Sequence, residues 1–138
     1  MKLLLDTCAV IWRAGGAPMS QASMNAIDKA AASGGVLISP VSGWEIGLLT
    51  RLERRKPLEL GMDASVWFAR VISEPGASEA ALTWEIAMAS TRLPSGLHND
   101  PADRFLVATA RALDVPLVTR DDDLEAYAKA GHLKLIRC

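Results

Sequence analysis

The segment Lys2-Leu3-Leu4-Leu5-Asp6 is a short apolar run that ends on an acid. A continuous apolar run of this length predicts a β-strand that is buried on both faces, over residues 2–5. The run is far too short for a secretory signal or a membrane span. The segment therefore predicts a fold built around a buried strand whose carboxyl end carries Asp6.

Similar apolar runs recur along the chain and alternate with longer helical patterns. Further strands are expected at residues 36–38, 116–119 and 133–136. Helices are expected at residues 7–12, 21–32, 40–54, 63–73, 83–91, 101–113 and 124–130. Alternating strands and helices are typical of an α/β protein with a parallel sheet. The length of 138 residues suits one domain, expected to cover residues 1–138.

The composition excludes little about function. Apolar residues make up 50% of the chain and the net charge is -1, so a core can form and no polybasic arm is present. A near-neutral total neither supports nor excludes nucleic-acid binding, because a local basic strip is sufficient. Cys8 and Cys138 are too far apart for a metal-binding motif. We expect reduced thiols, a cytoplasmic location, and a packed rather than nucleophilic Cys8.

Two acids directly follow predicted strands. Asp6 follows the first strand, and Asp121 follows the apolar run that ends at Thr119. Ligands bind beyond the carboxyl ends of the strands in parallel α/β sheets, so both acids are candidates for one shared site. Each acid taken alone fits a loop or helix N-cap role equally well.

Glu45 interrupts the apolar face of a predicted helix. Its neighbours at helical spacing are Val41, Leu48, Leu49 and Leu52. A buried carboxylate costs several kcal/mol unless a partner compensates its charge. The partner is either an arginine, which makes Glu45 structural, or a metal ion, which makes it functional.

The segment Asp100-Pro101-Ala102-Asp103 has two interpretations. As a helix start it is complete, with Asp100 as N-cap, proline at the first position and Asp103 in the first turn. In the functional interpretation Asp103 projects toward the strand ends, and Asp100 either caps or lines the rim. Asp122 and Asp123 fit the solvated start of the next helix.

Together these acids predict a cation site. Converging carboxylates repel one another unless a cation joins them, and hard oxygen ligands suit Mg²⁺ or Mn²⁺. Such a site can activate water for phosphodiester hydrolysis. The chain has no GxxxxGK[ST] loop, no GxGxxG loop and no GxSxG elbow, which argues against the corresponding nucleotide-binding and hydrolase classes.

Four segments resemble the PIN-domain ribonucleases, in particular the VapC toxins of bacterial toxin–antitoxin pairs. The segments are Leu3-Leu4-Leu5-Asp6-Thr7-Cys8, Ser39-Pro40-Val41-Ser42-Gly43-Trp44-Glu45-Ile46, His98-Asn99-Asp100-Pro101-Ala102-Asp103-Arg104 and Leu117-Val118-Thr119-Arg120-Asp121. They occur in the family's order and span nearly the whole chain. Ala102 departs from the family, which often has phenylalanine at that position.

The resemblance implies a fold, a cofactor and partners. The fold is a three-layer α/β/α arrangement with a central parallel sheet. The cofactor is Mg²⁺ or Mn²⁺, bound by Asp6, Glu45, Asp103 and Asp121, with Asp100 near the site. The activity is endonucleolytic cleavage of structured RNA, commonly tRNA or rRNA, which stops translation. The partners are a VapB-type antitoxin and a second copy of the chain in a homodimer. Operator DNA is contacted only through the antitoxin, and no association with a membrane is expected.

Other residues are expected around the acids. Thr7 and Ser42 either support the ligands by hydrogen bonding or act only as caps. Candidate RNA contacts are Arg51, Arg54, Arg55 and Lys56 at the far end of the Glu45 helix, with Arg104 and Arg120 beside the acids. The alternatives are a solvated helix end for the first group and ion pairs for the last two. Trp12, Trp44, Trp67 and Trp84 fit core or interface positions better than base stacking.

Other functions stay open at this point. The chain could be a PIN-scaffold binding module that cleaves nothing and serves in an antitoxin–DNA repressor complex. It could also be a carboxylate metal nuclease for DNA, or a nuclease of general RNA processing. Metal-dependent RNase activity of the free protein separates the first alternative from the toxin.

Overall fold

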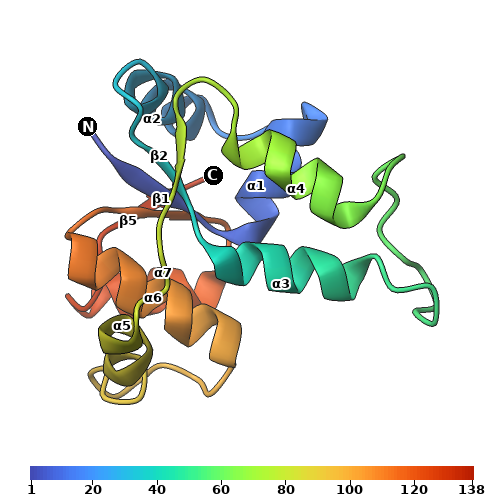
Figure 1. The fold of residues 1–138 in the computed structure, drawn as a ribbon. Helices are drawn as coiled ribbons and strands as arrows, with labels where there is room; N and C mark the ends of the chain where they lie inside the picture. Colours follow the sequence, from blue (N-terminus) through green and yellow to red (C-terminus); the bar gives the residue numbers. More distant parts are fainter.

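A computed structural model describes residues 1–138, and its centre is a five-stranded parallel sheet (Figure 1). The strands are β1 (Leu3–Leu5), β2 (Val36–Ile38), β3 (Ala77–Glu79), β4 (Leu117–Thr119) and β5 (Leu135–Arg137). Their order in the sheet is β3-β2-β1-β4-β5, and every neighbouring pair is parallel. The strand that opens the chain is therefore the central one, as a fully buried leucine run predicts.

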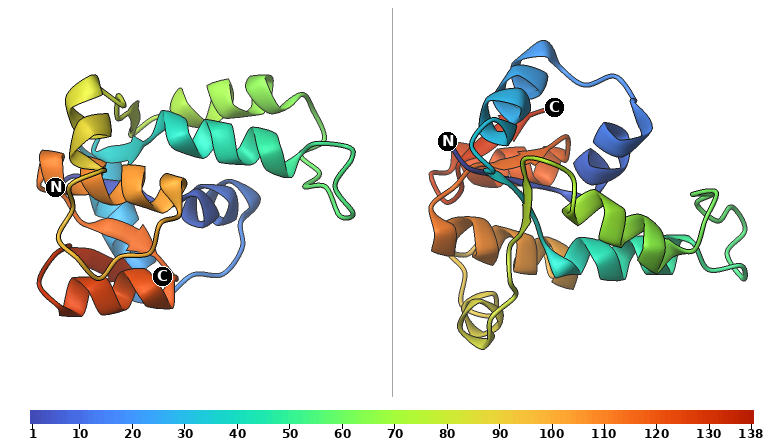
Figure 2. Two further views of the ribbon diagram at one scale, coloured as in Figure 1. Left: turned by 90° about the horizontal axis from the view of Figure 1, so that it is seen from below. Right: turned by 45° about the horizontal axis from the view of Figure 1, so that its top comes forward.

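Helices cover both faces of the sheet (Figure 2). They are α1 (Thr7–Gly15), α2 (Gln21–Ala31), α3 (Pro40–Leu49), α4 (Ala64–Ile72), α5 (Trp84–Ala89), α6 (Pro101–Leu113) and α7 (Asp122–Lys129). Residues of α1, α2 and α4 share one core cluster with alternate strand residues, and residues of α6 and α7 share the other. The predicted three-layer α/β/α fold is confirmed.

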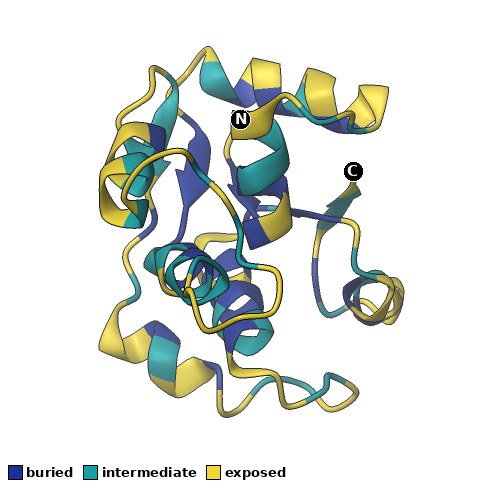
Figure 3. Ribbon diagram, turned by 90° about the vertical axis from the view of Figure 1, so that its right-hand side faces the viewer, coloured by how far each residue is buried: buried dark blue, intermediate teal, exposed yellow.

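The alternation of side chains along β1 divides the core into these two parts. Leu4 belongs to the cluster with α6 and α7, whereas Leu3 and Leu5 belong to the cluster with α1, α2 and α4. All three leucines are 0% exposed, and Figure 3 shows the sheet centre in the buried colour. Burying each leucine contributes about 2 kcal/mol, so β1 holds both layers against the sheet.

Two elements differ from the sequence prediction. The sequence did not indicate β3, because Ala77-Ser78-Glu79 has no β-branched residue and lies partly exposed at the sheet edge. The Glu45 helix ends at Leu49 instead of near Arg54, with Thr50 as its C-cap. The amide of Leu58 then donates to the carbonyl of Leu49, which turns the chain back. The basic residues after Leu49 consequently lie in a loop.

Helices α3 and α4 and the loop between them extend away from the sheet as an arm (Figures 1 and 2). The N-terminal part of α3 stays with the body of the protein, where its buried residues Val41, Ser42 and Ile46 pack. The basic loop lies at the tip of the arm, while Glu45 lies halfway along α3.

No helix of the protein is both long and apolar enough to cross a membrane.

Candidate active site

The candidate site lies at the carboxyl end of the parallel sheet. Asp6 directly follows β1, and Asp121 follows the neighbouring strand β4 after one residue. Helix α3 follows β2 on the other side of β1 and carries Glu45, and α6 supplies Asp103 from its first turn. The four predicted ligand acids therefore come from four segments that meet at one edge.

Asp6 is the most deeply placed acid, with 8% of its surface exposed. One carboxylate oxygen accepts the amide N–H of Thr7 at 2.7 Å, so Asp6 does act as the N-cap of α1. The other oxygen accepts the hydroxyl of Thr119 at 2.6 Å. The capping and the functional interpretations of Asp6 are thus compatible, because a cap fixes the orientation of the carboxylate at the strand end.

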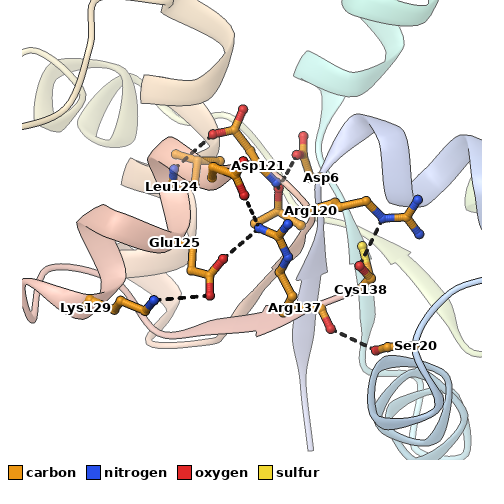
Figure 4. Close-up of polar contacts among 11 residues, drawn as sticks. Asp6, Ser20, Arg120, Asp121, Leu124, Glu125, Lys129, Arg137 and Cys138 are labelled. Carbon is orange, nitrogen blue, oxygen red and sulfur yellow. Dashed lines mark hydrogen bonds and ion pairs between the residues drawn. The ribbon is translucent and has the colours of Figure 1, made fainter.

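Thr119 connects Asp6 to Asp121. The hydroxyl oxygen of Thr119 accepts a hydrogen bond from the amide N–H of Asp121 at 3.1 Å, and the same hydroxyl group donates a hydrogen bond to Asp6. Asp121 caps α7, since its Oδ1 accepts the amide N–H of Leu124 at 3.0 Å (Figure 4). One buried hydroxyl therefore sets the spacing between the two strand-end acids.

Glu45 is half-buried and hydrogen-bonded to the α1 start. The hydroxyl of Thr7 donates to Glu45 and lies 3.0 Å from the hydroxyl of Ser42. No arginine pairs with Glu45, so the structural alternative of an arginine partner is not realised. Leu52, predicted on the same apolar face, lies beyond the end of α3 and is 89% exposed. The hydrogen bond from Thr7, rather than a fully apolar face, orients this carboxylate.

Asp100 and Asp103 have different environments. Asp100 is exposed and caps α6 by accepting the amide N–H of Asp103 at 3.1 Å. The side chain of Asp103 is 20% exposed, and its Oδ2 lies 3.2 Å from Nε2 of His98. Asp103 is therefore held by an imidazole and not by a helix cap.

Burial and mutual repulsion make ionisation of this cluster unfavourable. Burial raises the pKa of Asp6, and the charges of Asp121 and Asp100 raise it further, although hydrogen bonds from Thr119 and Thr7 oppose the rise. Burial raises the pKa of Asp103 to about 7, with contributions from Asp6, Asp100 and Asp121. Burial also raises the pKa of Glu45, with a contribution from Asp6. Carboxylates that resist ionisation together favour a shared cation.

The closest group of possible metal ligands is not the predicted one. Ligand atoms of His98, Asp121 and Asp123 all lie within 4.8 Å of one another, and no other group of acids, histidines or cysteines has this spacing. Asp6, Glu45 and Asp103 face the same region but are spread more widely. Asp122 pairs with Arg137 at 2.9 Å, as expected of a solvated helix start.

The two arginines beside the acids bind backbone oxygens. Arg104 donates to the carbonyls of Ser90, Leu97 and His98 at 3.0–3.4 Å. Arg120 donates to the main-chain oxygen of Cys138 at 3.0 Å (Figure 4). It also donates to that of Pro18 at 3.2 Å and stacks 4.0 Å above the Trp12 ring. Neither forms the ion pair that was the alternative to RNA contact. Arg104 instead fixes the segment that leads into α6.

The basic group at the arm tip is exposed. Arg51, Arg54, Arg55 and Lys56 all lie in the loop after α3, and Arg51 pairs with the exposed Glu53. The prediction placed them at the far end of the Glu45 helix, which was expected to reach about Arg54. Their role in RNA contact stays a prediction. It applies to a loop at the tip of the arm and not to a helix beside the acids.

The expectation of a packed Cys8 was wrong, whereas for Trp44 and Trp84, expected in the core or at an interface, the structure excludes only the core. Cys8 is exposed rather than packed, and partial desolvation with the charges of Asp6 and Glu45 raises its pKa to about 11. Trp44 and Trp84 are 55% and 75% exposed, so neither is a core residue. Trp44 lines an apolar cavity of about 390 Å³ with Val41, Leu82 and Phe105. The helical pattern located these residues but did not show which faces stay uncovered.

Sequence reasoning missed two residues of the site. Thr119 is the last residue of a predicted strand, and only the pairing of β1 with β4 brings it to Asp6. His98 precedes Asp103 by five residues, and this short separation is the one sequence signal of their contact. Both act on acids rather than contributing carboxylates, so a search for acids did not find them.

Comparison with known proteins gives the family. The PIN-domain family model matches residues 3–130, so the chain belongs to the PIN-domain family. Ribonuclease VapC22 of Mycobacterium tuberculosis is 29% identical over 126 residues, which cover 91% of this chain and 91% of that protein. The predicted resemblance is thereby confirmed.

Solved structures share the fold. A chain of VapBC2 from Rickettsia felis, bound to a DNA fragment from its promoter, matches with a TM-score of 0.69 and 15% identity over 99% of this chain and 98% of that one. A chain of VapBC-5, a toxin–antitoxin member from Mycobacterium tuberculosis, matches with a TM-score of 0.60 and 20% identity over the full length of both chains. At these identities the matches show the architecture.

Proposed function

We propose that this protein is a divalent-metal-dependent endoribonuclease of the VapC type and the toxin of a type II toxin–antitoxin pair. The observation that carries the proposal is the convergence of Asp6, Glu45, Asp103 and Asp121 at one end of the sheet, where burial and the charges of neighbouring acids raise the pKa of the first three. The name of the relative, Ribonuclease VapC22, supports the same activity.

The donor set fits Mg²⁺ or Mn²⁺. Every candidate ligand among the four acids is a carboxylate oxygen, which is the ligand type that these hard cations prefer. A bound cation supplies a water of lowered pKa and stabilises the charge that develops on the phosphate. A cation also removes the repulsion that raises the pKa of Asp103. The acids therefore fit the cofactor that the family resemblance implies.

The residues around the site have different proposed roles. Asp6 and Asp103 hold the main cation, and Glu45 and Asp121 complete the negative pocket directly or through water. Thr7 and Thr119 keep these oxygens in place with the hydrogen bonds described above. Ser42 supports Thr7, and Asp100 stays at the rim as the cap of α6. The scissile phosphate must then approach from the exposed side, beyond the strand ends.

The partners follow from the family and the relatives. We propose a structured RNA substrate, tRNA or rRNA, whose cleavage stops translation in the cytoplasm. We also propose a VapB-type antitoxin that inhibits the toxin, a homodimer, and operator DNA bound through the antitoxin. The two structural relatives above are VapBC assemblies, one of them bound to promoter DNA.

A second candidate function is a silent binding module in a repressor complex. The DNA-bound state of the Rickettsia felis relative is the observation that favours it. This candidate and the toxin make opposite predictions for RNA when the chain is produced without an antitoxin.

Brief expression in cells with sequencing of RNA 5′ ends tests the proposal. The wild-type chain should slow growth and produce new 5′ ends at a few defined positions in tRNA or rRNA. Asp6→Asn should do neither while accumulating to the same level, because Asn keeps the cap but loses the charge. Asp28→Asn, on the exposed side of α2, should behave like wild type. Equal toxicity of Asp6→Asn, or no new 5′ ends with wild type, contradicts the proposal.

A further inference from the structure

His98 lies between two acids of the site and contacts each with a different ring nitrogen. Its Nε2 is 3.2 Å from Oδ2 of Asp103, and its Nδ1 accepts the amide N–H of Asp100 at 3.2 Å. The carbonyl of His98 also accepts a hydrogen bond from Arg104 at 3.3 Å. Both ring nitrogens of His98 are therefore held by contacts, and Arg104 holds the backbone of this residue.

The hydrogen bond from Asp100 determines the tautomer. A backbone N–H can only donate, so Nδ1 carries no proton, and the proton of the neutral ring is on Nε2. Nε2 then donates to the carboxylate of Asp103 and has no free lone pair. A histidine that binds a metal through one ring nitrogen usually donates the N–H of the other ring nitrogen to an acceptor. The amide N–H of Asp100 is a donor and cannot serve as that acceptor. The geometry thus favours a donor to Asp103 over a ligand, although His98 is within 4.8 Å of Asp121 and Asp123.

We propose that His98 is a positioning residue that holds Oδ2 of Asp103 so that Oδ1 faces the cation. The inference rests on the proposed function, because it takes Asp103 as a metal ligand. The other side chains whose charges act on Asp103 are Asp6, Asp100 and Asp121, which are all acids and offer no donor. Without His98 the carboxylate would be free to rotate away from Asp6, whose charge repels it.

Calorimetric titration of the purified protein with Mn²⁺ tests this role. His98→Ala should raise the Kd for Mn²⁺ about 10- to 100-fold, which is typical for loss of an outer-shell partner. His98→Gln should recover to within about threefold of wild type, because its terminal NH₂ can occupy the position of Nε2. His98→Asn should bind as weakly as His98→Ala, since its shorter amide reaches the position of Nδ1 only. His132→Ala removes the other imidazole and should leave the Kd unchanged.

The possible results separate this inference from the proposed function. Wild-type affinity in His98→Ala overturns the positioning role alone. Equal weakness of His98→Gln and His98→Ala also overturns it, because a donor at the position of Nε2 then fails to restore binding. Absence of Mn²⁺ binding by wild type contradicts the proposed function, and with it the inference.

Discussion

Replacement of Asp103 by asparagine should stabilise the metal-free protein at pH 8. The folded state holds the Asp103 proton up to a pKa of about 7, because of burial and neighbouring acids, whereas the unfolded chain releases it near 3.8. Between these values the unfolded state binds fewer protons than the folded state, so the free energy of unfolding falls as pH rises. The penalty is absent below about pH 4 and fully present above about pH 7, and asparagine removes it.

The magnitude follows from the same pKa values. A rise from 3.8 to about 7 corresponds to about 4 kcal/mol at 1.36 kcal/mol per pH unit. The side chain is 20% exposed, so solvent screening reduces the figure, and we expect a gain of about 2 to 3 kcal/mol for Asp103→Asn at pH 8. Mn²⁺ should largely cancel this difference, because a cation at 100 times its Kd stabilises the wild type by about 2.7 kcal/mol and should not stabilise the variant to this extent.

Urea unfolding followed by circular dichroism measures the effect. Wild type, Asp103→Asn and Asp28→Asn are compared in EDTA at pH 4, 6 and 8, and again at pH 8 with Mn²⁺. The variant should gain over wild type as pH rises, while Asp28→Asn controls for the loss of one exposed charge. A variant that is less stable than wild type in EDTA at pH 8, or a difference that does not shrink toward pH 4, refutes the reasoning.

Two further predictions concern Thr119, which holds two of the acids, and the basic loop at the tip of the arm. Thr119→Val should lower the free energy of unfolding by about 2 kcal/mol at pH 8, because Asp6 loses a buried donor and the amide of Asp121 loses its acceptor, whereas Thr119→Ser should keep both. Equal stability of the two variants in urea unfolding would contradict this account of Thr119. Neutralising Arg54 and Arg55 together in an Asp6→Asn background should reduce the slope of log K for RNA against log salt by about 0.7 per charge, and an unchanged slope would remove the arm loop from the RNA-binding surface.

The position of the strand-end acids was predictable because parallel strands end at one edge. The leucine run at residues 3–5 and the run that ends at Thr119 locate Asp6 and Asp121 without any knowledge of side-chain contacts. The helix signals at Pro40 and Pro101 likewise predicted the helices that carry Glu45 and Asp103. Fold and acids were accessible because they depend on local patterns and on one rule of sheet geometry.

The connections between the acids were not predictable in the same way. Thr119 contacts an acid 113 residues away, and the use of each ring nitrogen of His98 depends on the loop that Arg104 fixes. The strand β3 has no sequence pattern because it is three residues long, partly exposed at the sheet edge and without β-branched residues. The early end of α3 depends on the return of the chain to Leu49. Such features come from tertiary contacts, which local sequence patterns do not reveal.

Cleavage of a structured RNA by the purified protein tests the central claim most directly. The protein is stripped with EDTA, mixed with tRNA or an rRNA fragment, and titrated with Mg²⁺ or Mn²⁺. Wild type should cleave at discrete sites only when the cation is present, and Asp6→Asn should not cleave at any cation concentration. Cleavage by wild type in excess EDTA, or equal cleavage by a folded Asp6→Asn protein, would contradict a cation-dependent ribonuclease centre at Asp6.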